Sequence, residues 1–191
     1  DGDRLDYLVR DAHYTGVSTG VDMGRLIATM SLQNSSLVVK EKGLPAVEAL
    51  LTARATMYQT VYFHSFARGA QLMLARAATS AISSGDFSIN DFVTFTDHKF
   101  LSELNKSGVL SHVLCNDFEN RKIVKRAVSI TKEQMELSGL EKSKKKDYED
   151  SIASKLGIDS SKIYVDIPKF SVMPGLKTKI LKNDGTISLA H

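Results

Sequence analysis

The stretch DGDRLDYLVRDAHYTGV, residues 1–17, carries the most informative pattern in the chain. Asp3, Tyr7 and Asp11 are spaced four residues apart, which places their side chains on one face of a helix. Apolar positions such as Leu5 fall on the opposite side, so that side is expected to pack against a core. Two carboxylates and a phenol on one face can line a polar pocket, and Asp3 could ligate a cation. A helix-capping role is the alternative for Asp3, and it requires no ligand.

The sequence outward from this stretch predicts mostly helices. We expect them at residues 21–30, from Pro45 with a bend near His64 as far as Gly85–Asp86, and at residues 90–107 and 118–130, with a strand at residues 36–41. Beyond about residue 131 the chain becomes rich in lysine and glutamate, and KIYVDIP and KTKILKNDGTISL alternate like strands. We therefore predict a mainly α chain in which residues 1–130 form a helical core and residues 131–191 a small α+β region.

Composition excludes several classes of protein. The chain has 191 residues, 42% of them hydrophobic, which suits one globular domain with a small appendage. A net charge of +3 is too small to indicate nucleic-acid binding, and no apolar run reaches the ~18 residues of a membrane span. The single cysteine, Cys115, cannot form an internal disulfide. It predicts a buried thiol in a reducing compartment, so we expect a cytoplasmic protein.

A second stripe lies on the long helix. Arg54, Tyr58 and Tyr62 follow the same four-residue spacing. A guanidinium can bind two phosphate oxygens at once, and a tyrosine ring can lie against a sugar or a base. From spacing alone, packing of the two tyrosines with their hydroxyls at the solvent edge explains the stripe equally well.

Both stretches resemble the HD-domain deoxynucleoside triphosphate triphosphohydrolases. The first resembles the family's pattern D-x-D-R-x-D-Y-x-x-R-D-x-x-x-x-G, with matches at Asp1, Asp3, Arg4, Asp6, Tyr7, Arg10, Asp11 and Gly16. The segment VDMGRLI follows it as in the family, and LLTARATMYQTVYFHSFARGAQLML is similar to the pattern R-x-x-x-Y/H-x-x-x-Y-x-H-K. The fold that this resemblance implies is the C-terminal portion of an HD-domain helical fold.

The resemblance implies a role for particular side chains. Asp3 falls on the family's distant metal ligand and Arg4 on a phosphate contact, while Tyr7 and Asp11 fall on the sugar side of the nucleotide. On the long helix, Arg54 falls on a triphosphate contact and Tyr62 on a contact with the sugar or the base.

Two positions of the long-helix pattern differ from many relatives. Phe63 stands where some relatives carry a polar residue that reads the base, and Ser65 replaces a lysine.

The implied activity is metal-dependent hydrolysis of deoxynucleoside triphosphates. Water attacks the α-phosphorus and triphosphate leaves, with one divalent metal ion (Mn, Mg, Fe, Ni or Zn) orienting the phosphates. The family's other metal ligands, a histidine and a His-Asp pair, are not matched in this sequence, and we expect them before Asp1. We therefore predict that this chain alone is inactive. Another HD-domain nucleotidase or phosphodiesterase activity, or a non-catalytic helical interaction module, remains the alternative.

A third patch concerns partners. Arg121 and Lys125 are four residues apart, and regulated relatives use an Arg and a Lys at this spacing to bind an activating nucleotide at a subunit contact. The resemblance thus implies a possible effector site and a homo-oligomer that binds nucleoside triphosphates. A solvated basic face is the alternative for both residues.

Overall fold

The computed structural model describes residues 2–137, 145–167 and 178–189 of the 191-residue chain. The described residues are mostly helical, with a single four-stranded sheet among them. They form two compact units: residues 2–64 with 178–189, and residues 65–137 with 145–167. The mainly α fold with a small amount of sheet is therefore confirmed. The boundary near residue 131 was expected from a change in composition. The two units are defined by spatial contacts, so they do not test this boundary, and it stays a prediction.

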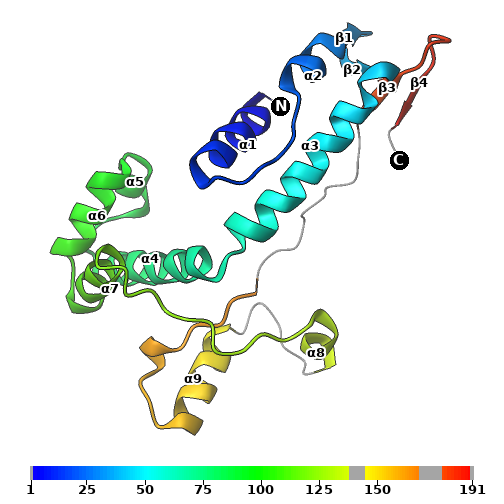
Figure 1. Cartoon of the computed structure of the whole chain (residues 1–191). Helices are drawn as coiled ribbons and strands as arrows, with labels where there is room; N and C mark the ends of the chain where they lie inside the picture. The colour runs from blue at the N-terminus through cyan, green and yellow to red at the C-terminus, as the bar shows by residue number, and fades with distance from the viewer. Residues whose placement is uncertain (1, 138–144, 168–177, 190–191) are drawn as a thin grey trace. The chain divides into compact units, whose positions relative to one another are not determined.

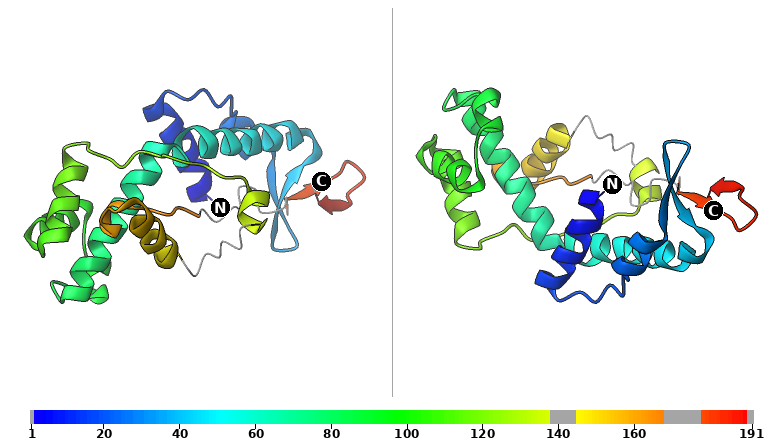
Figure 2. Two further views of the ribbon diagram at one scale, coloured as in Figure 1. Left: turned by 90° about the horizontal axis from the view of Figure 1, so that it is seen from below. Right: turned by 90° about the horizontal axis from the view of Figure 1, so that it is seen from above.

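The first unit contains three α-helices and the sheet among its described residues. Its elements are α1 (Gly2–Thr15), α2 (Met23–Thr29), β1 (Met30–Gln33), β2 (Ser36–Lys40), the 3-10 turn η1 (Glu41–Gly43), α3 (Leu44–Met57), the π-helical turn η2 (Tyr58–Tyr62), β3 (Lys179–Leu181) and β4 (Ile187–Leu189). Figures 1 and 2 show α1 lying alongside α3. Leu8 of α1 is buried against Ala53 and Met57 of α3, so the apolar side expected for the first helix does pack on a core.

The sheet joins two hairpins that are far apart in sequence. Its strand order is β1-β2-β3-β4, with β2 parallel to β3 and the other two pairs antiparallel. The β1–β2 turn places Asn34 (φ 49°) and Ser35 (φ 57°) in the left-handed region, which is the geometry of a tight two-residue hairpin. Val39 pairs with Ile180, and both are buried together with residues of α2 and α3. The strands predicted at residues 36–41 and around the Asp184–Gly185 turn are confirmed.

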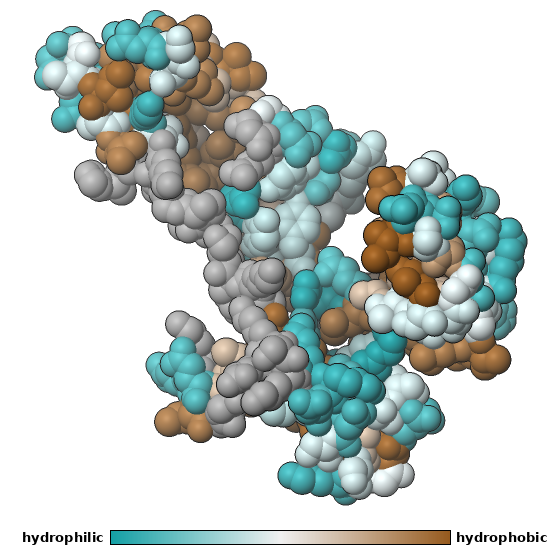
Figure 3. All heavy atoms as spheres, turned by 180° about the vertical axis from the view of Figure 1, so that it is seen from behind, coloured by the Kyte–Doolittle hydropathy of each residue, from teal (hydrophilic) through white to brown (hydrophobic). Residues whose placement is uncertain are grey.

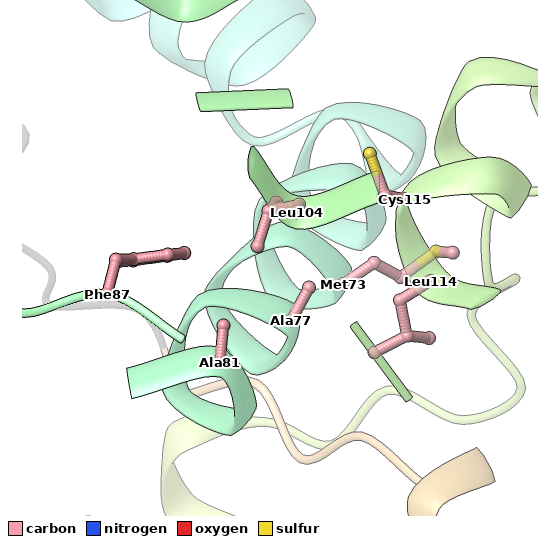
Figure 4. Packing of buried hydrophobic residues seen from close by; sticks show 7 residues of the cluster. All are labelled: Met73, Ala77, Ala81, Phe87, Leu104, Leu114 and Cys115. Atoms are coloured by element: carbon pink, nitrogen blue, oxygen red, sulfur yellow. The ribbon is translucent and has the colours of Figure 1, made fainter. Parts of the chain in front are cut away.

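The second unit is built around α4. Its elements are α4 (Ser65–Ser84), α5 (Ile89–Val93), α6 (Asp97–Lys106), α7 (Val109–Glu119), α8 (Lys132–Leu137), α9 (Lys145–Leu156) and the 3-10 turn η4 (Ser160–Lys162). Figure 4 shows Met73 and Ala77 of α4 facing Leu104 of α6 and Leu114 of α7. Cys115 lies fully buried in the same cluster, as predicted for an inert thiol.

Three sequence predictions in this unit differ from the structure. The helix expected over residues 90–107 is interrupted at residues 94–96, between α5 and α6. Residues 121–130 form no helix, because α7 ends at Glu119 and the chain then continues as an extended segment. Residues 163–167, from KIYVDIP, alternate like a strand but pair with none. Both segments instead have side chains packed on the α4 cluster, namely Ile123, Val124 and Tyr164. Alternating apolar residues thus indicate that one side of a segment is buried. An extended segment that packs on a helix meets this condition without being a β-strand.

The described residues expose several apolar side chains at the surface. Ile89, Phe92 and Val93 of α5 are exposed, and apolar residues gather at the α5–α6 end of the second unit in Figure 3. None of the described helices is long and apolar enough to cross a membrane.

Candidate functional site

The residues of the first stripe all lie on α1 of the first unit. Asp3 is exposed in the first turn of the helix, which begins at Gly2, so Asp3 lies inside the helix and not before it. Tyr7 and Asp11 follow on the same face and are half-buried. The side chain of Arg4 lies outside the described part of the structure.

The second stripe begins on α3 and meets the first one. Arg54 occupies the last turn of α3, and its Nη1 donates a 2.8 Å hydrogen bond to the hydroxyl of Tyr7. Its Nη2 donates to the hydroxyl of Tyr58 at 3.3 Å, and the guanidinium carbon lies 5.0 Å from the centre of the Tyr58 ring. The Nε of Arg54 is fully buried and has no hydrogen-bond partner among the described residues. A buried donor without a partner is costly, so an acceptor that reached this nitrogen would remove that cost.

Tyr62 makes the other link between the two stripes. Its hydroxyl donates a 2.6 Å hydrogen bond to Oδ2 of Asp11, and its ring lies edge-on to that of Tyr7 with centroids 6.3 Å apart. Burial raises the pKa of Tyr62 well above its ordinary value, and the hydrogen bond from the phenol to Asp11 raises it further. The phenol therefore stays protonated at neutral pH and keeps donating to the carboxylate.

We call these five residues the arginine–tyrosine cluster: Tyr7, Asp11, Arg54, Tyr58 and Tyr62. The cluster holds a permanent cation with one unsatisfied donor, flanked by three aromatic rings and one carboxylate. An arginine so placed can bind an anion such as a phosphate group, and the rings can contact a sugar or a base. Tyr58 is the member to which the sequence assigned no role, although the four-residue spacing from Arg54 already placed it on this face.

A metal ion needs more ligands than these units supply. In the part of the chain that the structure describes, no three His, Cys, Asp or Glu side chains gather closely enough to hold a metal. Asp3 contributes a single carboxylate, whereas catalytic sites commonly use three or more protein ligands. The described residues therefore do not form a metal site by themselves.

The third patch differs in conformation from the sequence expectation. Arg121 has a φ of 57° directly after α7, and the chain around Lys125 is not helical. The two residues therefore do not share a helix face, because a left-handed residue ends the helical path. Both side chains are exposed in the second unit. Their role as an effector site, and the homo-oligomer that goes with it, stay predictions.

The comparisons with known proteins address the family. Residues 21–191 match the HD associated region family. The chain belongs to this family. It is also similar to a solved phosphohydrolase from Bacteroides thetaiotaomicron, with 26% identity, a TM-score of 0.64, and coverage of 99% of this chain and 55% of that one. A hypothetical protein from Aquifex aeolicus shows 28% identity and a TM-score of 0.65 over 98% of this chain and 47% of its own.

Two curated relatives are similar to parts of the chain. Uncharacterized protein MJ1154 of Methanocaldococcus jannaschii is 33% identical over 147 residues, which are 74% of this chain and 32% of that protein. The deoxynucleoside triphosphate triphosphohydrolase SAMHD1 homolog of Dictyostelium discoideum is 31% identical over 81 residues, 42% of this chain and 16% of its own. The chain thus spans about a third or less of these relatives. It is related to the HD phosphohydrolases.

Proposed function

We propose that this chain supplies part of the substrate site of a metal-dependent HD phosphohydrolase that cleaves deoxynucleoside triphosphates to deoxynucleoside and triphosphate. The observation that carries the proposal is the buried, unpartnered Nε of Arg54 beside its two tyrosine-bound nitrogens. A phosphate oxygen is one of the acceptors that a guanidinium binds most strongly. The related phosphohydrolases and the similarity to a named triphosphohydrolase give that anion a chemical class.

Each side chain then has a defined task. Arg54 binds the polyphosphate and offsets the charge that develops on the leaving triphosphate. Tyr7 and Tyr62 line the sugar side, and Asp11 orients the Tyr62 hydroxyl through their 2.6 Å hydrogen bond. Asp3 would contribute one carboxylate to a divalent metal ion whose other ligands come from residues outside this chain. That metal, when bound, would orient the phosphates and polarise the attacking water.

The test uses the full-length protein and product analysis. We expect deoxynucleoside and triphosphate as products, whereas orthophosphate or a monophosphate would indicate a different HD-domain activity. Asp3→Ala should abolish hydrolysis together with metal binding. Arg54→Ala should lower kcat/KM by roughly 30- to 1,000-fold, the range for losing one charge-stabilising donor. Arg54→Lys should recover only part of this loss, because an ammonium is a point charge without a fork.

Glu48→Ala provides the control, since Glu48 is exposed on the same helix and lies outside the cluster. It should behave like the wild type. Unchanged kinetics of Arg54→Ala on every deoxynucleoside triphosphate would remove the proposal's main support. A full-length protein that binds no metal and hydrolyses no nucleotide would favour a non-catalytic interaction module.

A further inference from the structure

Arg54 is held by contacts that Tyr58 supplies in two different ways. An arginine side chain has many rotamers, and fixing it in one of them needs contacts on more than one side. The Tyr58 hydroxyl accepts from Nη2 at 3.3 Å, which is at the long end of the range for a hydrogen bond. The Tyr58 ring lies 5.0 Å from the guanidinium carbon, well within the distance of a cation–π interaction. The ring therefore supplies a contact with the guanidinium that adds to this long hydrogen bond.

The Tyr58 ring is itself fixed by neighbouring rings. Tyr62 lies edge-on to it with centroids 5.1 Å apart, and Phe63 does so at 5.5 Å. Edge-to-face pairs at these distances are favourable, so the ring has a defined orientation against Arg54. Phe63 thereby acquires a role as a support for Tyr58.

The π-helical turn separates the tasks of the two tyrosines. The Tyr58 N–H still bonds to the carbonyl of Arg54, so Tyr58 continues the regular helix face on which Arg54 lies. The next turn is wider, because the N–H of Phe63 bonds to the carbonyl of Tyr58, five residues earlier, at 2.8 Å. π-Helical turns are rare in proteins overall, and those that occur are often found at functional sites. Tyr62, at the end of this turn, bonds to Asp11 on α1 while Tyr58 stays with Arg54.

We propose that Tyr58 is a positioning residue for Arg54. It keeps the guanidinium in place through its ring, with the unpartnered Nε left to bind a ligand oxygen, and it acts through Arg54 without contacting the polyphosphate. The kinetic part of the test rests on the proposed function, whereas the structural part does not.

The kinetic test compares five variants of the full-length protein, Arg54→Ala among them, with the wild type, with deoxynucleoside triphosphates as substrates. Tyr58→Phe keeps the ring and should raise KM by no more than about threefold. Tyr58→Met removes the ring at similar bulk and should raise KM about tenfold, in the direction of Arg54→Ala. The double variant Arg54→Ala/Tyr58→Met should be no worse than Arg54→Ala alone, because a residue that acts only through Arg54 has nothing left to position. Tyr14→Met, at an 81% exposed tyrosine of α1, should match the wild type.

The structural test is a crystal structure of the full-length Tyr58→Met variant. We expect the Arg54 side chain to lose its single conformation, and its hydrogen bond to Tyr7, while the backbone of α3 is unchanged. An Arg54 guanidinium still held at the Tyr7 hydroxyl would overturn the proposal even if the protein proved to have no nucleotide activity. Additive effects of Arg54→Ala and Tyr58→Met on KM would overturn it as well, since a purely structural role gives that result. A wild-type protein without activity would refute the proposed function and leave the crystallographic result to decide on Tyr58.

Discussion

Replacing Gly43 by alanine should destabilise the first unit. Gly43 is buried in η1, directly before α3. A Cβ atom at this position would lie 2.7 Å from Cβ of Thr29 and 2.7 Å from Cγ1 of Val39, and closer still to Oγ1 of Thr29. Carbon atoms in contact prefer about 3.5–4.0 Å, so the new methyl group would overlap its neighbours by about an ångström.

Neither neighbour can move away cheaply. Thr29 and Val39 are each only 4% exposed. The Thr29 hydroxyl donates to the carbonyls of Arg25 and Leu26, both at 2.9 Å, and rotating it would break these hydrogen bonds. Overpacking of a tight core commonly costs about 1–3 kcal/mol, and the rigidity of both neighbours places Gly43→Ala near the upper end, at about 2–3 kcal/mol.

Gly24→Ala is the matched control, because it adds the same methyl group in open surroundings. The nearest atom to a Cβ at Gly24 is Oδ1 of Asp22, at an ordinary 3.6 Å. Gly24 lies within α2, where alanine is favoured over glycine by up to about 1 kcal/mol. Denaturant midpoints and hydrogen exchange of α2, β2 and α3 should therefore shift in opposite directions in the two variants. A Gly43→Ala protein as stable and as well protected as the wild type would show that the packing around η1 is looser than the distances require.

Three further predictions concern buried ionisable groups. Arg76→Met should lower the free energy of unfolding by about 3–5 kcal/mol, because it leaves Glu149, only 10% exposed and paired at 2.6 Å, without its cation. In denaturant unfolding, Arg76→Met/Glu149→Leu should regain most of this loss. An equal loss in both variants would refute the account. Burial raises the pKa of the Cys115 thiol, so disulfide reagents at pH 8 should modify it only upon unfolding, and rapid reaction of the native protein would contradict this. Burial and the Asp11 hydrogen bond raise the pKa of Tyr62, so its stabilising effect is complete below about pH 10 and is lost as the pH rises further. In an ultraviolet titration, the tyrosinate absorbance of Tyr62→Phe should therefore rise near pH 10 by as much as that of the wild type. A smaller rise than in the wild type would disprove the shift.

The sequence by itself determined the helical character of the chain and placed the residues of the arginine–tyrosine cluster in two stripes of four-residue spacing. Side chains four residues apart share a helix face whatever the rest of the chain does, so the spacing alone groups Tyr7 with Asp11, and likewise Arg54 with Tyr58. The C-terminal hairpin was equally predictable, because the Asp184–Gly185 turn is a local signal. The long helix is also interrupted near His64, at residues 63–64.

Only the tertiary structure decided which of these local elements meet. The hydrogen bonds from Arg54 to Tyr7 and from Tyr62 to Asp11 join residues about fifty positions apart, and the parallel pairing of Val39 with Ile180 spans most of the chain. Such contacts depend on how whole elements pack, which no short pattern encodes. The π-helical turn at Tyr58–Tyr62 was also not predictable from the sequence. The spacing of these residues is the same as in an ordinary α-helix. In the structure, Tyr62 at the end of this turn contacts Tyr7 and Asp11 of α1, which lie far away in the sequence.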